Sequence, residues 1–379
     1  MNVLQTIILS GLAVAVGMSC TSGQPQGEQV DSAKTLKEAY ADKFYVGTAL
    51  DLGQIKGHNV AALEVVQQQF NSIVAENCMK SENIQPQEGV FFFDDADKFV
   101  ELGEKNGMHI VGHNLIWHSQ APDWFFVDKH GNDVSREVLT ERMRNHIHTI
   151  VSRYKGRIHG WDVVNEAILD NGEYRPSKFY EILGEDFIPL AFKFAHQADP
   201  EAELYYNDYS TAIPAKRAGI VRLTKKLQDD GIQIDGLGMQ EHHGLSHASL
   251  EETEKTIIDF ANLRVKVMVT EMDISVLPHA SPHVGAELAD TAAYNESFDP
   301  YKEGLPADKM NELGARYVSF FNLYLKHQDK ISRVTLWGVG DGDSWKNNWP
   351  IEGRTDYPLL FDRHYQPKPF LVDILELAN

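Results

Sequence analysis

The chain is poor in cysteine: Cys20 and Cys78 are its only two among 379 residues. Two cysteines allow neither a disulfide framework nor a zinc-binding spacing. The apolar run Ile7–Met18 is too short to be a typical transmembrane helix and has the length of a signal-peptide core. Positive charge is outweighed, with 35 Lys and Arg against 55 Asp and Glu, so the formal net charge is −20. This balance argues against nucleic acid or an anionic surface as the main partner.

The N-terminal segment has the features of an export signal. Its apolar run ends at Ser19-Cys20, and a small residue before a cysteine at that distance is typical of a lipoprotein processing site. We therefore expect residues 1–20 to be a signal peptide and Cys20 to become a lipidated N-terminus. The protein would then be exported and anchored to a membrane, at the cell surface or in the periplasm, or secreted if cleavage is ordinary. We expect no other membrane contact.

A tether and one folded domain follow the signal. Residues 21–29 are rich in Gly, Gln, Ser and Pro, and we expect a flexible tether over residues 21–35. The remaining residues, 36–379, show no second domain and no low-complexity region. Their composition, with 42% hydrophobic and 24% charged residues over the whole chain, is typical of a globular protein.

Eight short apolar segments alternate with stretches of helical periodicity in this domain. Repeated strand–helix alternation predicts a parallel sheet, and eight units can close into a (β/α)₈ TIM barrel of the α/β class. An open doubly wound sheet is the alternative, but no glycine-rich phosphate loop follows the first strand. The predicted strands are 44–50, 70–75, 109–115, 158–164, 203–206, 234–239, 265–270 and 333–336. The predicted helices include 95–106, 136–153, 179–198, 214–230, 250–262 and 308–327.

Two of the predicted strands end in glutamate. The strand over residues 158–164 is followed by Asn165 and Glu166, and the strand over residues 265–270 is followed by Glu271. The carboxyl ends of barrel strands meet at one face, where the chemistry of such folds is placed. A pair of facing carboxyl groups is the machinery that hydrolyses glycosidic bonds, with one group protonated and the other ionised. His242 and Asp273 could hold Glu271 and keep it ionised.

Other polar side chains lie at the ends of the predicted strands and would face the same site. Each one alone has a simpler structural explanation, since a single histidine is more often structural and a single lysine is more often a solvated charge. Their occurrence together is what favours a binding site. The set consists of Asn77, Lys80, His113, Asn165, Asn207, Gln240 and His242, and Trp337 and Trp345 could stack on sugar rings.

These motifs resemble those of glycoside hydrolase family 10, the endo-1,4-β-xylanases. They occur in the order of the family and cover roughly residues 36–378. No single motif is specific, but the set is. The motifs are ENCMK (76–80), GHNLIWHSQ (112–120), WDVVNE (161–166), YNDY (206–209), GMQEH (238–242), VTEMD (269–273), LWGV (336–339) and SW (344–345).

The resemblance implies an enzyme that cuts the β-1,4-xylose backbone of xylan internally and with retention of configuration. Glu166 matches the acid/base of the family and Glu271 its nucleophile, while Asp273 matches the partner of the histidine, His242, that orients the nucleophile. We expect a monomer that needs no cofactor and no metal. The positions that match sugar-contacting residues of the family are Asn77, Lys80, His113, Trp117, Asn165, Asn207, Tyr209, Gln240, His242, Trp337 and Trp345.

Three features depart from the pattern of the family. Cys78 stands where a larger polar residue is common, residues 340–343 are unusually acidic, and the connection over residues 277–307 is long. Long connections inside a compact domain are usually functional. These departures bear on the preferred chain length and on the accepted side-chain decorations, not on the reaction.

Three alternatives remain at this stage. A related barrel enzyme acting on β-1,4-glucan would share the glutamates, although Lys80 and residues 117–120 favour xylan. A non-catalytic, tethered sugar-binding lipoprotein would keep the aromatic residues but would not need two glutamates. A metal-dependent hydrolase could use His113, His118, His242 and Glu271, but no metal-ligand spacing occurs among them, and activity that survives EDTA would exclude it.

Overall fold

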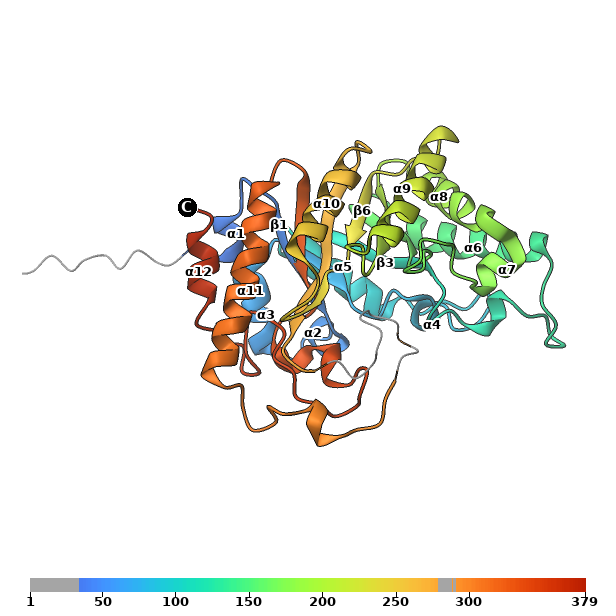
Figure 1. Cartoon of the computed structure of the whole chain (residues 1–379). Helices are drawn as coiled ribbons and strands as arrows, with labels where there is room; N and C mark the ends of the chain where they lie inside the picture. The colour runs from blue at the N-terminus through green and yellow to red at the C-terminus, as the bar shows by residue number, and fades with distance from the viewer. Residues whose placement is uncertain (1–33, 279–287, 289–290) are drawn as a thin grey trace, which may run out of the picture. The chain divides into compact units, whose positions relative to one another are not determined.

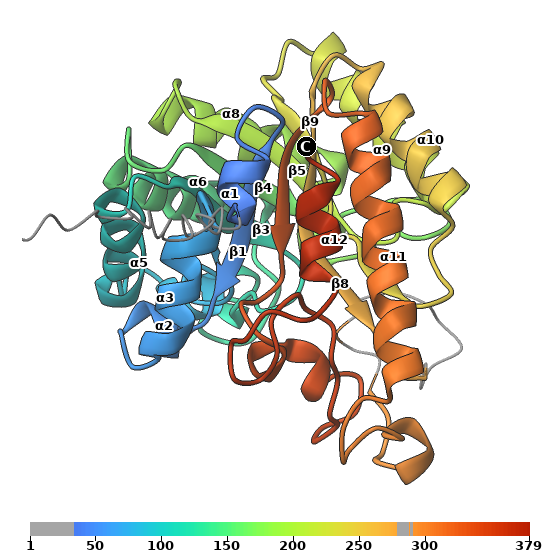
Figure 2. The ribbon, with the colours of Figure 1, turned by 90° about the vertical axis from the view of Figure 1, so that its left-hand side faces the viewer.

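Eight parallel strands follow one another around a closed ring in the computed structural model (Figures 1 and 2). The strands pair in the order β6-β5-β4-β3-β2-β1-β9-β8, and pairing between β6 and β8 closes the ring. The predicted TIM barrel is therefore confirmed. The ring strands are β1 (Tyr45–Leu50), β2 (Ser72–Ala75), β3 (His109–Trp117), β4 (Gly160–Asn165), β5 (Glu203–Asp208), β6 (Gly236–Met239), β8 (Lys266–Ser275) and β9 (Ile331–Leu336).

The structure describes residues 34–278, 288 and 291–379. The predicted signal peptide, Cys20 and most of the predicted tether lie outside the described residues. So does part of the long predicted connection, residues 279–287 and 289–290. Residues from Lys34 to Asn379 form one unit, and none of the helices described within it has the length and apolar character needed to cross a membrane.

The strands are buried on both faces, because helices cover the outside of the ring and side chains fill its inside. All residues of β2 and β4 are buried, which explains why the sequence shows continuous apolar runs instead of an alternating pattern. A ninth strand, β7 (His242–Gly244), pairs with the carboxyl-terminal end of β8. It was not predicted, since three residues are too few to produce a pattern.

Helices cover the outside of the ring (Figure 2). The predicted helix over residues 179–198 is in fact two helices separated by the turn η2 (Gly184–Asp186). Gly184 has a φ of 62°, a value that interrupts an α-helix and that glycine adopts without steric cost. The helices are α1 (Leu36–Ala39), α2 (Leu52–Ile55), α3 (Val60–Gln69), α4 (Ser81–Ile84), α5 (Asp94–Lys105), α6 (Arg136–Arg153), α7 (Lys178–Leu183), α8 (Phe187–Ala198), α9 (Pro214–Asp229), α10 (Leu250–Ala261), α11 (Ala307–Lys326) and α12 (Leu371–Glu376).

Two apolar clusters hold the barrel together. The larger one lies between the strands and the surrounding helices and includes the fully buried Trp161 of β4. The smaller one includes Val74, Val111, Tyr205 and Met268, with Trp337 just after β9. With the ring fixed in this way, the carboxyl ends of all eight strands come to one face, and their polar residues meet there.

Candidate active site

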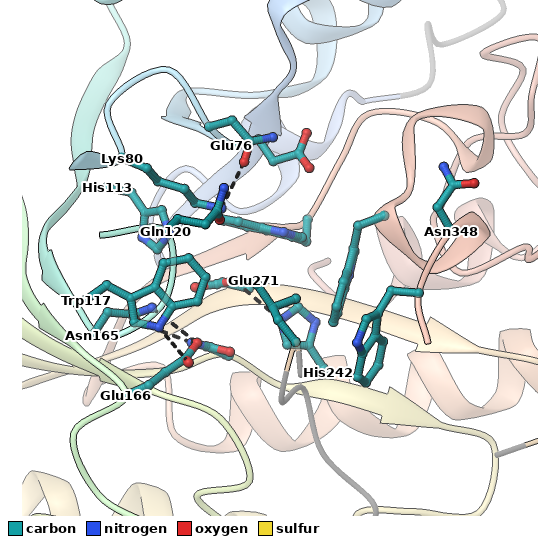
Figure 3. A pocket seen from close by; sticks show the side chains of 16 residues that line it. Glu76, Lys80, His113, Trp117, Gln120, Asn165, Glu166, His242, Glu271 and Asn348 are labelled. Atoms are coloured by element: carbon teal, nitrogen blue, oxygen red, sulfur yellow. Dashed lines mark hydrogen bonds and ion pairs between the residues drawn. The ribbon is translucent and has the colours of Figure 1, made fainter. Parts of the chain in front are cut away.

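A cavity of about 340 Å³ lies at the carboxyl ends of the strands (Figure 3). It brings together most of the residues that the sequence singled out, from segments spread over more than half of the chain. The predicted residues that line it are Asn77, Lys80, His113, Trp117, Asn165, Glu166, Gln240, His242, Glu271, Trp337 and Trp345.

Glu166 is almost fully buried beside this cavity, with 5% of its surface exposed. Nε1 of Trp117 donates a hydrogen bond of 2.7 Å to Oε2 of Glu166. Nε2 of Gln240 and Nδ2 of Asn165 donate to Oε1, at 2.9 and 3.1 Å. Burial raises the pKa of the Glu166 carboxyl above its ordinary value, although the charge of His118 and the hydrogen bonds from Gln240 and Trp117 oppose the shift. Glu166 is therefore suited to carry a proton near neutral pH.

The backbone of Glu166 is held in an uncommon conformation. Its φ is 59°, in the left-handed region that residues with a Cβ rarely occupy. The backbone N–H of Glu166 donates to the carbonyl oxygen of Asn207 at 2.9 Å. The carbonyl oxygen of Glu166 accepts a hydrogen bond of 2.9 Å from Nε of Arg175. These two bonds fix the turn at the end of β4 that directs the carboxyl group into the cavity.

Glu271 lies in β8 and has a different environment. Nδ2 of Asn207 donates a hydrogen bond of 2.7 Å to Oε1 of Glu271, and Nε2 of His242 lies 3.3 Å from Oε2. Burial alone would raise the pKa of Glu271, but the hydrogen bond from His242, the charges of His113 and His242, and the bond from Asn207 together hold it below its ordinary value. The surroundings of Glu271 therefore favour its ionised form, whereas those of Glu166 favour its protonated form.

His242 connects Glu271 with Asp273. Its Nδ1 lies 3.0 Å from Oδ2 of Asp273, and that oxygen also accepts a hydrogen bond of 2.8 Å from Nε1 of Trp345. Burial would lower the pKa of His242, but the charge of Asp273 and the bonds to both carboxylates raise it to about 9. The ring thus stays protonated at neutral pH and supplies a positive charge next to Glu271. Asp273 itself does not line the cavity.

Buried Lys80 and half-buried Glu76 are two charged residues in the wall of the cavity. Nζ of Lys80 donates to Oδ1 of Asn77 at 2.9 Å and lies 4.9 Å from the centre of the Trp117 ring. Burial lowers the pKa of Lys80 and raises that of Glu76, and the opposite charge of each partner opposes the shift of the other. The sequence interpretation missed Glu76 as a site residue, although it stands in the ENCMK motif.

His113 lies within β3, not at the end of a strand as predicted. Its Nδ1 lies 2.9 Å from Oδ2 of Asp162 in the neighbouring strand β4. Its ring packs edge-on against Trp337, with 5.3 Å between ring centres. The carboxylate of Asp162 therefore fixes the orientation of the imidazole that faces the cavity.

Aromatic rings form another wall. Trp345 and Trp349 are stacked with 4.6 Å between their centres, and Nζ of Lys346 lies 4.7 Å from the centre of the Trp345 ring. Trp349 lines the cavity but was missed, and the signal that could have found it is a second tryptophan four residues after Trp345. The other lining residues that were missed are Gln120, Leu288 and Asn348.

Two predicted sugar-contacting residues are not among those that line the cavity. Asn207 lies behind the cavity and connects Glu271 with Asn165. Its Nδ2 donates to Oε1 of Glu271 and also to Oδ1 of Asn165, the latter at 2.9 Å. Tyr209 accepts a hydrogen bond of 2.8 Å from Arg175, and its ring lies 3.6 Å from Nζ of Lys216. The geometry gives both residues a positioning task around Glu166.

Within the described residues, no group of three or more His, Cys, Asp or Glu side chains is arranged to hold a metal ion. The chemistry that the site offers is that of two carboxyl groups. They share one cavity, and their pKa values are shifted in opposite directions, the pattern that marks an acid and a nucleophile or base.

Comparison with known proteins agrees with this chemistry. The model of the family described as Glycosyl hydrolase family 10 matches residues 35–377. The chain is 51% identical over 343 residues to endo-1,4-β-xylanase A of Xylanibacter ruminicola. The aligned region covers 90% of this chain and 93% of that protein. Among solved structures, a family 10 endoxylanase retrieved from a sugarcane soil metagenome superposes with a TM-score of 0.88 at 48% identity, covering 90% of this chain and 99% of that one.

A further solved structure shows a related protein with a sugar bound. It is a mutant protein in complex with xylotriose, and it superposes with a TM-score of 0.79 at 32% sequence identity. The match covers 90% of this chain and 99% of that one.

Proposed function

Because the chain belongs to glycosyl hydrolase family 10, we propose that it is an endo-1,4-β-xylanase with Glu166 as acid/base and Glu271 as nucleophile. The observation that carries these roles is the opposite shift of the two carboxyl pKa values in one cavity. The names of its relatives support xylan as the substrate, and the xylotriose complex of a related protein supports binding of its oligomers.

The first step needs a proton and an anion at the same time. Glu166 gives its proton to the glycosidic oxygen while the bond from that oxygen to the anomeric carbon breaks. The carboxylate of Glu271 attacks the same carbon from the opposite face and forms an ester with the sugar. His242 and Asn207, which bind the Glu271 carboxylate in the free enzyme, keep it ionised and oriented for this attack.

The second step reverses these roles. Glu166, now ionised, takes a proton from a water molecule, whose oxygen attacks the anomeric carbon and breaks the ester to Glu271. Two inversions at one carbon leave the configuration retained. Both residues return to their starting protonation states, because the proton taken from water replaces the one given to the leaving group.

The remaining lining residues would hold the sugar chain. Trp337 and Trp345 offer aromatic faces to the apolar faces of xylose rings, while Asn77, Lys80 and His113 offer polar groups to the hydroxyls. The polar side chains are anchored by other protein groups, so they need little further ordering when sugar binds.

The test is the product profile of the purified protein on unsubstituted xylan and on glucuronoxylan, beside a β-glucan. We expect mixed xylo-oligosaccharides to appear early, as internal cleavage requires. If the protein acts only on the β-glucan, the assignment of xylan as the substrate is wrong, while the fold and the roles of the two glutamates still stand.

We also propose that the protein is exported and anchored through a lipid on Cys20. The support is the apolar run that ends at Ser19-Cys20 and the Gly-, Gln-, Ser- and Pro-rich residues that follow. A single acyl chain binds membranes weakly, so stable anchoring requires the several chains of a processed lipoprotein. Mass spectrometry of the N-terminal peptide should find acylated Cys20, and Cys20→Ala should move the enzyme to the soluble fraction. An unmodified N-terminus would contradict the proposal.

A further inference from the structure

A second hollow lies on the same end of the barrel as the cavity, with a volume of about 440 Å³. We call it the Phe92 hollow. We propose that it binds further xylose units of the xylan chain that the cavity cleaves, and this inference rests on the proposed function. Its wall comes from α2, from α5 and from the segment after β2, and it is lined by Leu52, Lys56, Cys78, Asn83, Phe92, Asp94, Asp95 and Lys98.

Phe92 is an exposed aromatic residue whose backbone is anchored to the fold. Its side chain is 60% exposed, while its backbone N–H donates to the carbonyl oxygen of Ile84 at 2.9 Å. The neighbours Phe91 and Phe93 stack on each other with 5.3 Å between ring centres and pack against the core. Phe92 is thus the member of this aromatic run that is left to solvent, as a platform for the apolar face of a sugar requires.

The charges of the hollow are balanced. Two lysines, Lys56 and Lys98, balance the charges of two aspartates, Asp94 and Asp95. Nζ of Lys56 lies 3.1 Å from Oδ2 of Asp95. A balanced set does not select an ion, but it offers both donors and acceptors to hydroxyl groups. The exposed amide of Asn83 adds one more of each. The chemistry therefore fits a neutral, hydroxyl-rich ligand such as a xylose chain.

The hollow adjoins the cavity at one short segment that borders both. Cys78, which lines the hollow, stands between Asn77 and Lys80, which line the cavity. Nδ2 of Asn83 donates to the carbonyl oxygen of Asn77 at 3.0 Å, so the two sites share a wall. Burial raises the pKa of Cys78 to about 12, so its thiol stays protonated and forms an inert part of that wall. In the proposed arrangement a polymer bound in the cavity passes over this segment to Phe92, and a short oligomer does not reach it.

The kinetic test compares long and short substrates. For Phe92→Ala we expect kcat/KM on polymeric xylan to fall about 3- to 10-fold, a change of about 0.7–1.4 kcal/mol. On an activated aryl xylobioside, which fills only the cavity, kcat/KM should stay unchanged. Phe92→Tyr keeps an aromatic face and should restore activity on the polymer. Tyr45→Ala is the matched control, since Tyr45 is an exposed aromatic, 46% accessible, at the opposite end of the barrel.

A binding test removes turnover from the comparison. In a Glu271→Ala background, Phe92→Ala should weaken the retardation of the protein in native gels that contain xylan, while Tyr45→Ala should not. Unchanged retardation and unchanged kinetics of Phe92→Ala would overturn this inference and leave the proposed function standing. Equal losses on polymer and aryl xylobioside would also overturn it. Failure of the unmutated protein to act on xylan would instead overturn the proposed function.

Discussion

Nε2 of His242 lies 3.3 Å from Oε2 of Glu271. The other ring nitrogen lies 3.0 Å from Asp273, which raises the pKa of the imidazole to about 9. A protonated ring next to Glu271 stabilises the ionised form of that carboxyl group. The state of the nucleophile therefore depends on a residue outside β8, delivered by the short strand β7.

The acid limb of the pH profile should report this contact. Glu271 must be ionised to attack, and its lowered pKa keeps it ionised to a lower pH than an ordinary glutamate. Changing His242→Gln removes the positive charge, so the pKa of Glu271 rises and the acid limb of kcat/KM moves to higher pH. His130→Gln, a change at an exposed histidine, is the control and should leave the limb in place. An unmoved limb in His242→Gln would contradict the role of the imidazolium.

The basic limb should report Glu166, which must be protonated for the first step. Trp117→Phe keeps a ring near Lys80 but removes the donor to Oε2 of Glu166. That donor favours the ionised carboxyl, so its loss should raise the pKa of Glu166 further and move the basic limb to higher pH. Trp124→Phe is the matched control, because its Nε1 donates to the carbonyl oxygen of Gln85 instead. A shift to lower pH would mean that the bond supports the protonated form.

The two glutamates should differ on an activated substrate. Glu271→Ala should lose turnover on xylan and on an aryl xyloside with a good leaving group, since neither forms an ester without the carboxylate. Glu166→Ala should lose activity on xylan but form the ester from the aryl xyloside, seen as a burst of released phenol. Equal losses on the aryl xyloside would show that the roles are assigned wrongly.

Retention of configuration can be observed directly. NMR of the first products from a xylo-oligosaccharide should show the β-anomer appearing before mutarotation, because two inversions restore the starting configuration. Early appearance of the α-anomer would make Glu271 a base for water instead of a nucleophile.

Barrel stability should depend on a close approach between two strands. A Cβ added at Gly112 of β3 would lie 2.1 Å from Cε3 of Trp161 in β4, and both residues are buried. Gly112→Ala should therefore lower the free energy of unfolding by about 1–3 kcal/mol or more, measured by denaturant titration. Gly342→Ala, where an added Cβ meets nothing within 4 Å, should leave it unchanged. Equal stability of the two variants would contradict the packing argument.

The sequence predicted the strands well where burial on both faces produced continuous apolar runs, as in β4. It failed where the local pattern was too short or was interrupted. The three residues of β7 leave no period, and Gly184 divides a helix whose apolar residues continue on both sides. Trp349 was missed although a second tryptophan four residues after Trp345 marks it, and Phe92 was missed because an exposed aromatic looks the same in a sequence whether or not it faces a hollow.

The sequence by itself determined the barrel, since alternating buried strands and amphipathic helices can bury their apolar surfaces in few other ways. It also placed Glu166 and Glu271 near the carboxyl ends of strands that share one face, although β8 continues past Glu271 to Ser275 and does not end before it as predicted. What only the tertiary structure decided is the full set of contacts that makes their pKa values differ. That difference depends on Trp117 and Gln240 around one carboxyl and on His242 and Asn207 around the other. Because a pKa is set by burial and by neighbours that come from separate strands, no local stretch of the sequence contains it.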